Sequence, residues 1–283
     1  MLFRVLWALF LLAACHSNQR SIKIDGSSTV FPISEAVVEE FQKKFPAKVT
    51  IGISGTGGGF KKFCAGNLSI AAASRAISDS EKKHCAENHI SFRELRIAYD
   101  GIVLVVNPQN DWVSDISLPE LKTMWEPAAQ NRIKLWSQIN PAWPKKQIHL
   151  FAPGVDSGTY DYFTKEIVGK EHASRGDITS SEDDNVLIQG ISTDPLAFGF
   201  IGFGYYAENQ KKLKALSVKG VMPSYENILN KRYAPLSRPL FLYVAESELK
   251  KPNVRDFVEY YLHQSDALIK EVGYVPLEQQ STL

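Results

Sequence analysis

Three short turns rich in serine, threonine and glycine are the segments of this chain best suited to chemistry. Gly26-Ser27-Ser28-Thr29 comes first, and the tripeptide Ser-Gly-Thr then occurs twice, at residues 54–56 and 157–159. Each turn follows a predicted strand and precedes a predicted helix. Helix starts offer unpaired N–H groups and partial positive charge, hydroxyls add donors, and glycine permits close approach. The turns predict a site for a compact oxyanion, although each hydroxyl alone is explained more simply as a helix cap.

Two arginines could supply positive charge to such a site. Arg75 follows Ser74 at the end of a predicted strand, and Arg175 lies in a polar segment beyond the second Ser-Gly-Thr turn. A guanidinium pairs well with an oxyanion through parallel hydrogen bonds. Each arginine could instead form a surface salt bridge, so both are candidates only.

Known nucleotide and hydrolase motifs do not match these turns. The stretch VTIGISGTGGGF at residues 49–60 has the glycine spacing of a P-loop, but Gly58 and Gly59 stand where that motif needs Lys and Ser or Thr. Phe60 occupies the position of the last glycine of the dinucleotide motif. No G-x-S-x-G or metal-ligand cluster occurs, and a triad of distant residues stays open. We therefore expect no catalytic residues, no metal and no cofactor.

The elements that position the turns alternate between strands and amphipathic helices. Residues 21–77 show the order strand, helix, strand, helix, strand, which is typical of a mostly parallel sheet with helices on its faces. A similar order follows in the middle third, and residues 253–277 predict one long C-terminal helix. We expect two α/β lobes, one of residues 21–105 plus 239–283 and one of residues 106–238. A cleft between lobes is a common place for a small ligand.

The N-terminus predicts export. Arg4 precedes an apolar run over residues 5–14, which is short for a membrane span but suits a signal peptide. The run ends in Leu-Ala-Ala before Cys15, so residues 1–14 are expected to be removed and Cys15 lipidated, unless an ordinary signal peptide is cut nearby. In an exported chain the pair Cys64 and Cys85 favours a disulfide over two buried thiols. A net charge of +1 argues against a large nucleic-acid footprint.

Six stretches together resemble the phosphate-binding lipoprotein subunit of bacterial high-affinity phosphate ABC transporters, in its cysteine-containing branch. The resemblance covers essentially the whole mature chain. It is carried by IDGSSTVFPISEAVVEEF, ISGTGGGFKKFCAGNLSIAAASRAIS, DGIVLVVNP, FAPGVDSGTYDYF, SSEDDNVLIQGIS and PLSRPLFLYV. It implies a class II periplasmic binding protein fold, with mixed, mostly parallel sheets, helices on both faces and orthophosphate in the cleft between the lobes.

The resemblance also implies which residues contact phosphate. They are Ser28, Thr29 and Val30 in the first turn, Ser54 and Gly55 in the second, and Ser157, Gly158 and Thr159 in the third. The family's aspartate after the serine of the third strand is Arg75 here, and its arginine four residues before the serine of the last turn is Pro153. We therefore expect Ser74, Arg75 and Arg175 to complete the site, and Asp156 to accept the proton of hydrogen phosphate.

These expectations describe a receptor that breaks no bond. It would be held by a lipid anchor at the periplasmic or extracytoplasmic face of a membrane, capture inorganic phosphate and deliver it to the permease subunits of an ABC transporter. A receptor for sulfate or another tetrahedral oxyanion is the first alternative. An exported phosphomonoesterase and a surface adhesin are further alternatives.

Overall fold

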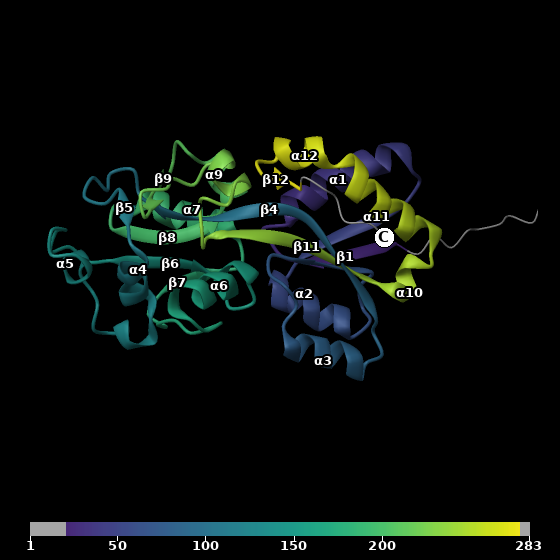
Figure 1. Cartoon of the computed structure of the whole chain (residues 1–283), viewed down its shortest axis with the longest axis horizontal. Helices are drawn as coiled ribbons and strands as arrows, with labels where there is room; N and C mark the ends of the chain where they lie inside the picture. The colour runs from purple at the N-terminus through teal and green to yellow at the C-terminus, as the bar shows by residue number, and fades with distance from the viewer. Residues whose placement is uncertain (1–20, 278–283) are drawn as a thin grey trace, which may run out of the picture.

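Two α/β lobes joined by two long strands make up residues 21–277, the part of the chain described by the computed structural model (Figure 1). The predicted signal peptide and the lipidation at Cys15 lie outside these residues. The mixed sheet, the covering helices and the two-lobed form confirm the fold class predicted from the sequence.

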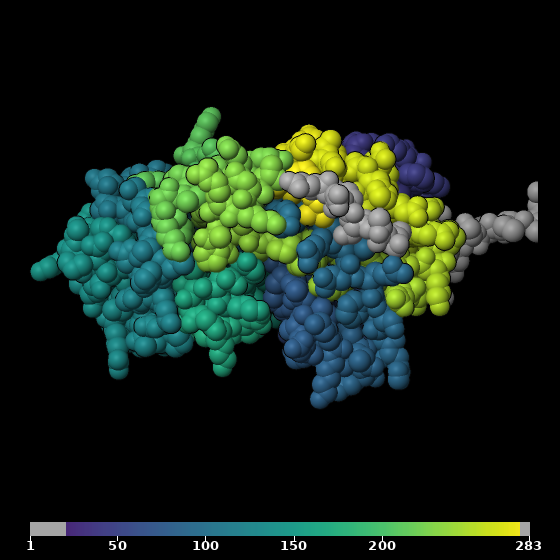
Figure 2. Space-filling model, viewed as in Figure 1, coloured from purple at the N-terminus to yellow at the C-terminus, as the bar shows by residue number. Residues whose placement is uncertain are grey.

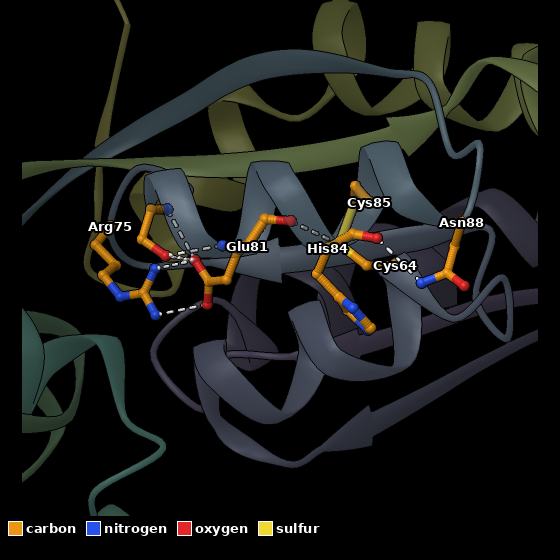
Figure 3. The surroundings of a disulfide bond; sticks show 7 residues. Cys64, Arg75, Glu81, His84, Cys85 and Asn88 are labelled. Atoms are coloured by element: carbon orange, nitrogen blue, oxygen red, sulfur yellow. Dashed lines mark hydrogen bonds and ion pairs between the residues drawn. A yellow bond between two sulfur atoms is a disulfide. The ribbon is translucent and has the colours of Figure 1, made fainter.

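The first lobe is built on a parallel sheet with the strand order β2 (Val49–Ile53), β1 (Ile22–Gly26) and β3 (Ile70–Ala73). Its helices are α1 (Phe31–Lys44), α2 (Gly55–Cys64) and α3 (Asp79–Glu87). Apolar residues at helical spacing, among them Val37 and Phe41, bury one face of α1. The predicted Cys64–Cys85 disulfide is confirmed and joins the end of α2 to α3 (Figure 3).

Two strands cross between the lobes. The first part of β4 (Phe92–Val106) pairs antiparallel with β11 (Ser237–Ala245), and its last part pairs antiparallel with β8 (Ala197–Gly202). Because β11 also pairs with β3, one path of paired strands runs from β2 to β7 through both lobes. Figure 1 shows β4 and β11 running side by side along the long axis of the molecule.

The second lobe repeats the parallel arrangement with β8, β6 (His149–Pro153) and β7 (Thr179–Ser181). Its longer helices are α4 (Leu118–Trp125), α6 (Gly158–Phe163), which continues as the π-helical turn η2 (Thr164–Val168), α7 (Asp184–Thr193) and α8 (Phe203–Glu208). Shorter elements are β5 (Asp115–Ile116), η1 (Pro127–Ala129), α5 (Trp136–Ile139), β9 (Lys214–Ala215), β10 (Ser217–Val218) and α9 (Tyr225–Leu229).

The C-terminal segment returns to the first lobe and differs from the prediction. One helix over residues 253–277 is wrong, because the chain forms α10 (Glu246–Leu249), α11 (Pro252–Gln264), α12 (Asp266–Glu271) and then β12 (Val275–Pro276). The hydroxyl of Ser265 donates to the carbonyl of Tyr261 at the break between α11 and α12. Gly273 then takes a φ of +84°, which ends the helical path and turns the chain toward β4.

The apolar core is divided in the same way as the sheet. One cluster of buried side chains is drawn from residues 102–236 together with Val275, and two others are drawn from residues 22–98 and 240–274. Figure 2 shows the two lobes directly against each other on the face in view. None of the helices in residues 21–277 is both long and apolar enough to cross a bilayer.

Candidate functional site

The first and last of the three predicted turns meet between the lobes. Ser28, Thr29 and the buried Val30 lie between β1 and α1, while Thr159 lies in the first turn of α6. The hydroxyls of Thr29 and Thr159 are 3.1 Å apart, and each residue is 1% exposed. The strand ends of both lobes therefore bring hydroxyl groups to one buried place, as the turn pattern predicts.

Gly158 shows why glycine stands at the centre of the last turn. A Cβ atom there would lie 2.5 Å from the hydroxyl oxygen of Thr56 and 2.6 Å from that of Ser74, both in the first lobe. Those two hydroxyls are themselves 3.3 Å apart, and Thr56 also accepts a hydrogen bond from the backbone N–H of Ser74. The lobes can approach this closely only because Gly158 has no side chain.

The second turn meets the other lobe through its backbone. Gly55 has a φ of +74°, and a Cβ atom there would lie 2.4 Å from the carbonyl oxygen of Asp156. That carbonyl accepts a hydrogen bond from the N–H of Gly57 at 3.0 Å. The carboxylate of Asp156 pairs instead with Lys61 at 3.2 Å and is 41% exposed.

The helix-cap explanation holds for one Ser-Gly-Thr turn and not for the other. The Ser157 hydroxyl oxygen accepts a hydrogen bond from the N–H of Thr159 at 3.2 Å and so caps α6. Ser54 has no such cap bond, and its hydroxyl donates to the carboxylate of Asp25 at 2.7 Å.

Arg238 is a member of this cluster that the sequence reasoning missed. It comes from the crossing strand β11 and is fully buried. Its guanidinium donates to the carbonyl of Gly158 at 2.9 Å, to the Thr159 hydroxyl at 2.7 Å and to the Thr29 hydroxyl at 3.3 Å. The carboxylate of Asp100 on β4 pairs with the same guanidinium, with Oδ2 2.9 Å from Nη2. The available signal was a single charged residue in the otherwise uncharged stretch PLSRPLFLYV.

Asp184 is the second missed member. It begins α7 in the second lobe, and its Oδ2 accepts a hydrogen bond from the Ser28 hydroxyl of the first lobe at 3.0 Å. Its Oδ1 is buried without a hydrogen-bond partner. Burial raises the pKa of Asp184 to about 7, although Ser28 and Arg238 oppose the shift. The segment Glu182–Asn185 is typical of a helix start, so nothing in the sequence assigned this carboxylate to the site.

The two predicted arginines are held elsewhere. Arg75 donates to Asp161 on α6 at 2.5 Å and to Glu81 on α3, so it lies at the boundary between the lobes. Arg175 donates to Asp177 at 2.6 Å and to the carbonyl of Met124, and its hydrogen bonds lower the pKa of Asp177 to about 2. The structure does not bring Arg175 to the turns.

The cluster has the composition of an oxyanion site. It combines hydroxyl donors from both lobes, one fixed guanidinium and one carboxylate that can hold or accept a proton. Within residues 21–277, no three His, Cys, Asp or Glu side chains gather in a way that could hold a metal ion.

Comparison with known proteins places the chain in a family. The model of the PBP superfamily domain matches residues 13–265. Protein SphX of Synechococcus elongatus is 48% identical, with 95% of this chain and 81% of SphX covered. The phosphate-binding protein PstS of Staphylococcus saprophyticus is 36% identical, with 98% of this chain and 91% of PstS covered.

A solved structure supports the same placement. An X-ray structure from Clostridium perfringens, assigned to a phosphate ABC transporter substrate-binding protein, has phosphate bound. It is 27% identical, covers 91% of this chain and 100% of its own, and superposes with a TM-score of 0.78. The chain therefore belongs to the PBP superfamily, in the family that also includes the phosphate-binding protein PstS.

Proposed function

We propose that this protein is an extracytoplasmic receptor that captures inorganic phosphate between its lobes and delivers it to an ABC permease without breaking a bond. The observation that carries the proposal is the buried meeting of Thr29, Thr159 and Arg238 with Asp184. These groups come from both lobes and a crossing strand: Thr29, Thr159 and Arg238 lie within hydrogen-bond distance of one another, and Asp184 accepts from Ser28 beside Thr29. The names and the bound phosphate of the relatives support the same ligand.

The hydroxyl and glycine positions of the predicted site are kept in this proposal. The backbone N–H groups and the hydroxyls of the turns donate to the phosphate oxygens, and Ser74 and Gly158 form part of the wall of the site. Arg238 takes the part that we expected of Arg75 and Arg175, because its guanidinium contacts turns of both lobes. Gly55 and Asp156 lie at the edge, where the two lobes meet, and Ser54 beside them bonds within the first lobe to Asp25.

Asp184 replaces Asp156 as the proposed proton acceptor. Hydrogen phosphate carries a proton that can be donated to the free Oδ1 of Asp184, whereas sulfate carries none near neutral pH. A fully ionised sulfate would place its oxygen lone pairs against the carboxylate in a buried site, with no water to separate them. The site therefore favours phosphate and the similar arsenate over sulfate.

Calorimetric titration of purified, phosphate-stripped protein with phosphate, arsenate and sulfate tests the proposal. We expect phosphate and arsenate to bind tightly and sulfate to bind far more weakly. Arg238→Lys keeps a charge beside Asp100 but cannot replace both terminal nitrogens, one of which donates to Gly158 and the other to the two threonines, so phosphate affinity should fall by about tenfold or more. Arg175→Lys is the matched control and should change little. Equal binding of sulfate, or equal loss in both variants, would contradict the site.

The membrane anchor is part of the proposal and rests on the sequence around Cys15 alone. Expression of the full chain in a bacterial host should place the protein in the membrane fraction, and mass spectrometry should find a lipid on Cys15. In the Cys15→Ser variant we expect release or failure of processing. A parent protein recovered without lipid would leave the receptor function standing and remove the anchor.

A further inference from the structure

A buried ion pair joins the two lobes beside the anion cluster. Nε of Arg75, in the first lobe, donates to Oδ2 of Asp161 on α6, in the second lobe, at 2.5 Å. The two side chains are 9% and 1% exposed. Arg75 directly follows Ser74, and Asp161 comes two residues after Thr159. Each member of the pair is therefore close in sequence to a residue of the site, one in each lobe.

Arg75 is held in place by its own lobe. Its two terminal nitrogens donate to the two carboxylate oxygens of Glu81 at 2.8 and 2.9 Å. Glu81 in turn accepts from the N–H of Ser78 in a capping box at the start of α3. Figure 3 shows that the same helix carries Cys85, whose disulfide to Cys64 fastens α3 to α2. Arg75 therefore keeps a partner and a fixed direction when the lobes move apart.

Asp161 depends on the other lobe. Burial raises its pKa, and Arg75 opposes that rise. Its second oxygen, Oδ1, is buried without a hydrogen-bond partner and lies 3.2 Å from the ring nitrogen Nδ1 of His172, which is half exposed. An ionised carboxylate in such a place needs the guanidinium opposite, because burying an unpaired charge is costly. A groove of about 390 Å³ lies beside the pair and is lined by Arg75 and Tyr162, so parting of the lobes would expose Asp161 to water.

We propose that Arg75 and Asp161 form an ionic clasp that stabilises the closed arrangement of the lobes without contacting the anion. The clasp forms only when the two lobes meet, so it shifts the open–closed equilibrium by its own free energy. Retention of phosphate then depends on two separate sets of contacts, those with the anion and those of the clasp. The kinetic consequence rests on the proposed function, but the effect on the lobes does not.

A second ion pair between the lobes offers a matched control. Lys61 and Asp156 are 3.2 Å apart, but their side chains are 74% and 41% exposed. Exposed pairs of this kind contribute little, because water and salt screen them. Lys61→Gln should therefore leave both the lobe arrangement and the ligand kinetics close to those of the parent.

The test compares the parent with Asp161→Asn, Arg75→Gln, the double variant and Lys61→Gln, all as mature protein. Stopped flow measures the rate of phosphate dissociation, and small-angle scattering measures the radius of gyration with and without saturating phosphate. We expect each clasp variant to release phosphate about tenfold faster, and the double variant to be no faster than the single ones. Without phosphate, the radius of gyration of each clasp variant should exceed that of the parent, and saturating phosphate should restore the compact form.

Two results would overturn the clasp. Effects of Arg75→Gln and Asp161→Asn that multiply in the double variant would mean that the residues act separately, with Arg75 as an anion ligand. Unchanged dissociation rates in the single variants would mean that the pair has no role in closure. If the parent binds no phosphate, the proposed function fails. The clasp is then tested by the phosphate-free radius of gyration alone, and a radius in the clasp variants equal to that of the parent rejects it.

Discussion

Asp184 and Arg238 have opposite charges, and both lie in the same buried site. Arg238 is neutralised from behind by Asp100, so its outer face can donate to neutral hydroxyls or to an anion. Asp184 has only the Ser28 hydroxyl on one oxygen, and burial raises its pKa to about 7. A ligand that brings both negative charge and a proton satisfies the two residues together. At the scale of single residues, we propose that this combination favours protonated oxyanions such as hydrogen phosphate over sulfate.

Asp184→Asn should change which anion binds. The amide offers an N–H where the carboxylate offered an acceptor, so phosphate affinity should fall by about tenfold or more while sulfate binding becomes measurable. Competition titrations with both anions at pH 7 measure the change. Asp183→Asn is the control, because Asp183 is exposed and asparagine can still cap α7. An unchanged ratio of the two affinities would exclude Asp184 as the acceptor.

The same substitution should alter how stability depends on pH. The pKa of Asp184 is about 7 in the folded protein and ordinarily 3.8. Between pH 3.8 and about pH 7 the folded protein therefore keeps a proton on Asp184 that the unfolded chain has released. Stability is therefore lost as pH rises through this window, by up to a few kcal/mol. Asp184→Asn removes that loss. Calorimetry without phosphate should show the variant gaining in Tm over the parent from pH 5 to pH 8, and a constant difference would contradict the buried, raised carboxylate.

Some site residues have a recognisable local sequence pattern and others have none. Ser28, Thr29 and Thr159 lie in turns whose composition is unusual within a few positions, so a local pattern predicts them. Arg238 and Asp184 look locally like a strand residue and a helix-start residue. Only the crossing strand and the closed lobes bring them to the turns, over separations of 209 and 156 residues. Such contacts have no signature in a single sequence.

At the scale of elements, the βαβαβ order was predictable because alternating and helical apolar spacings follow directly from what each element buries. The C-terminal segment shows the limit of that reasoning. Its apolar spacing continues past Ser265, but the side-chain hydrogen bond there and the left-handed Gly273 divide it into two helices and a strand. The strand β12 exists because β4 offers it an edge at Tyr99 and Ala98, which is a tertiary effect.

Gly158→Ala should prevent α6 from packing against the first lobe. Its added methyl group would lie within 2.6 Å of the hydroxyls of Thr56 and Ser74, which belong to the opposite lobe. The folded lobes themselves should tolerate the change, whereas phosphate affinity should fall by about tenfold to a hundredfold because closure is blocked. Gly176→Ala is the control, since its nearest neighbour there would be at 3.5 Å. Calorimetric titration of both variants measures the difference, and equal affinities would show that the lobes need not meet here.

At the scale of the whole molecule, the proposed anion site and the proposed clasp would make ligand binding and lobe closure one event. Separate core clusters stabilise each lobe, and the strands β4 and β11 connect them. Contacts through Arg238, Asp184 and Arg75 add to this connection only when the lobes are together. A ligand that binds only the closed, folded form must therefore also stabilise the fold.

Phosphate should raise the Tm of this protein, and the rise should depend on the site. At a concentration of about 100 times Kd, binding to the folded state adds about 2.7 kcal/mol, which for a chain of this size is a shift of roughly 5–10 °C. Scanning calorimetry with phosphate, and with sulfate at equal ionic strength, measures it. Arg238→Lys should show a smaller shift, because the anion then loses its connection to the crossing strand. An equal shift with sulfate would mean that salt, and not a bound phosphate bridging the lobes, stabilises the molecule.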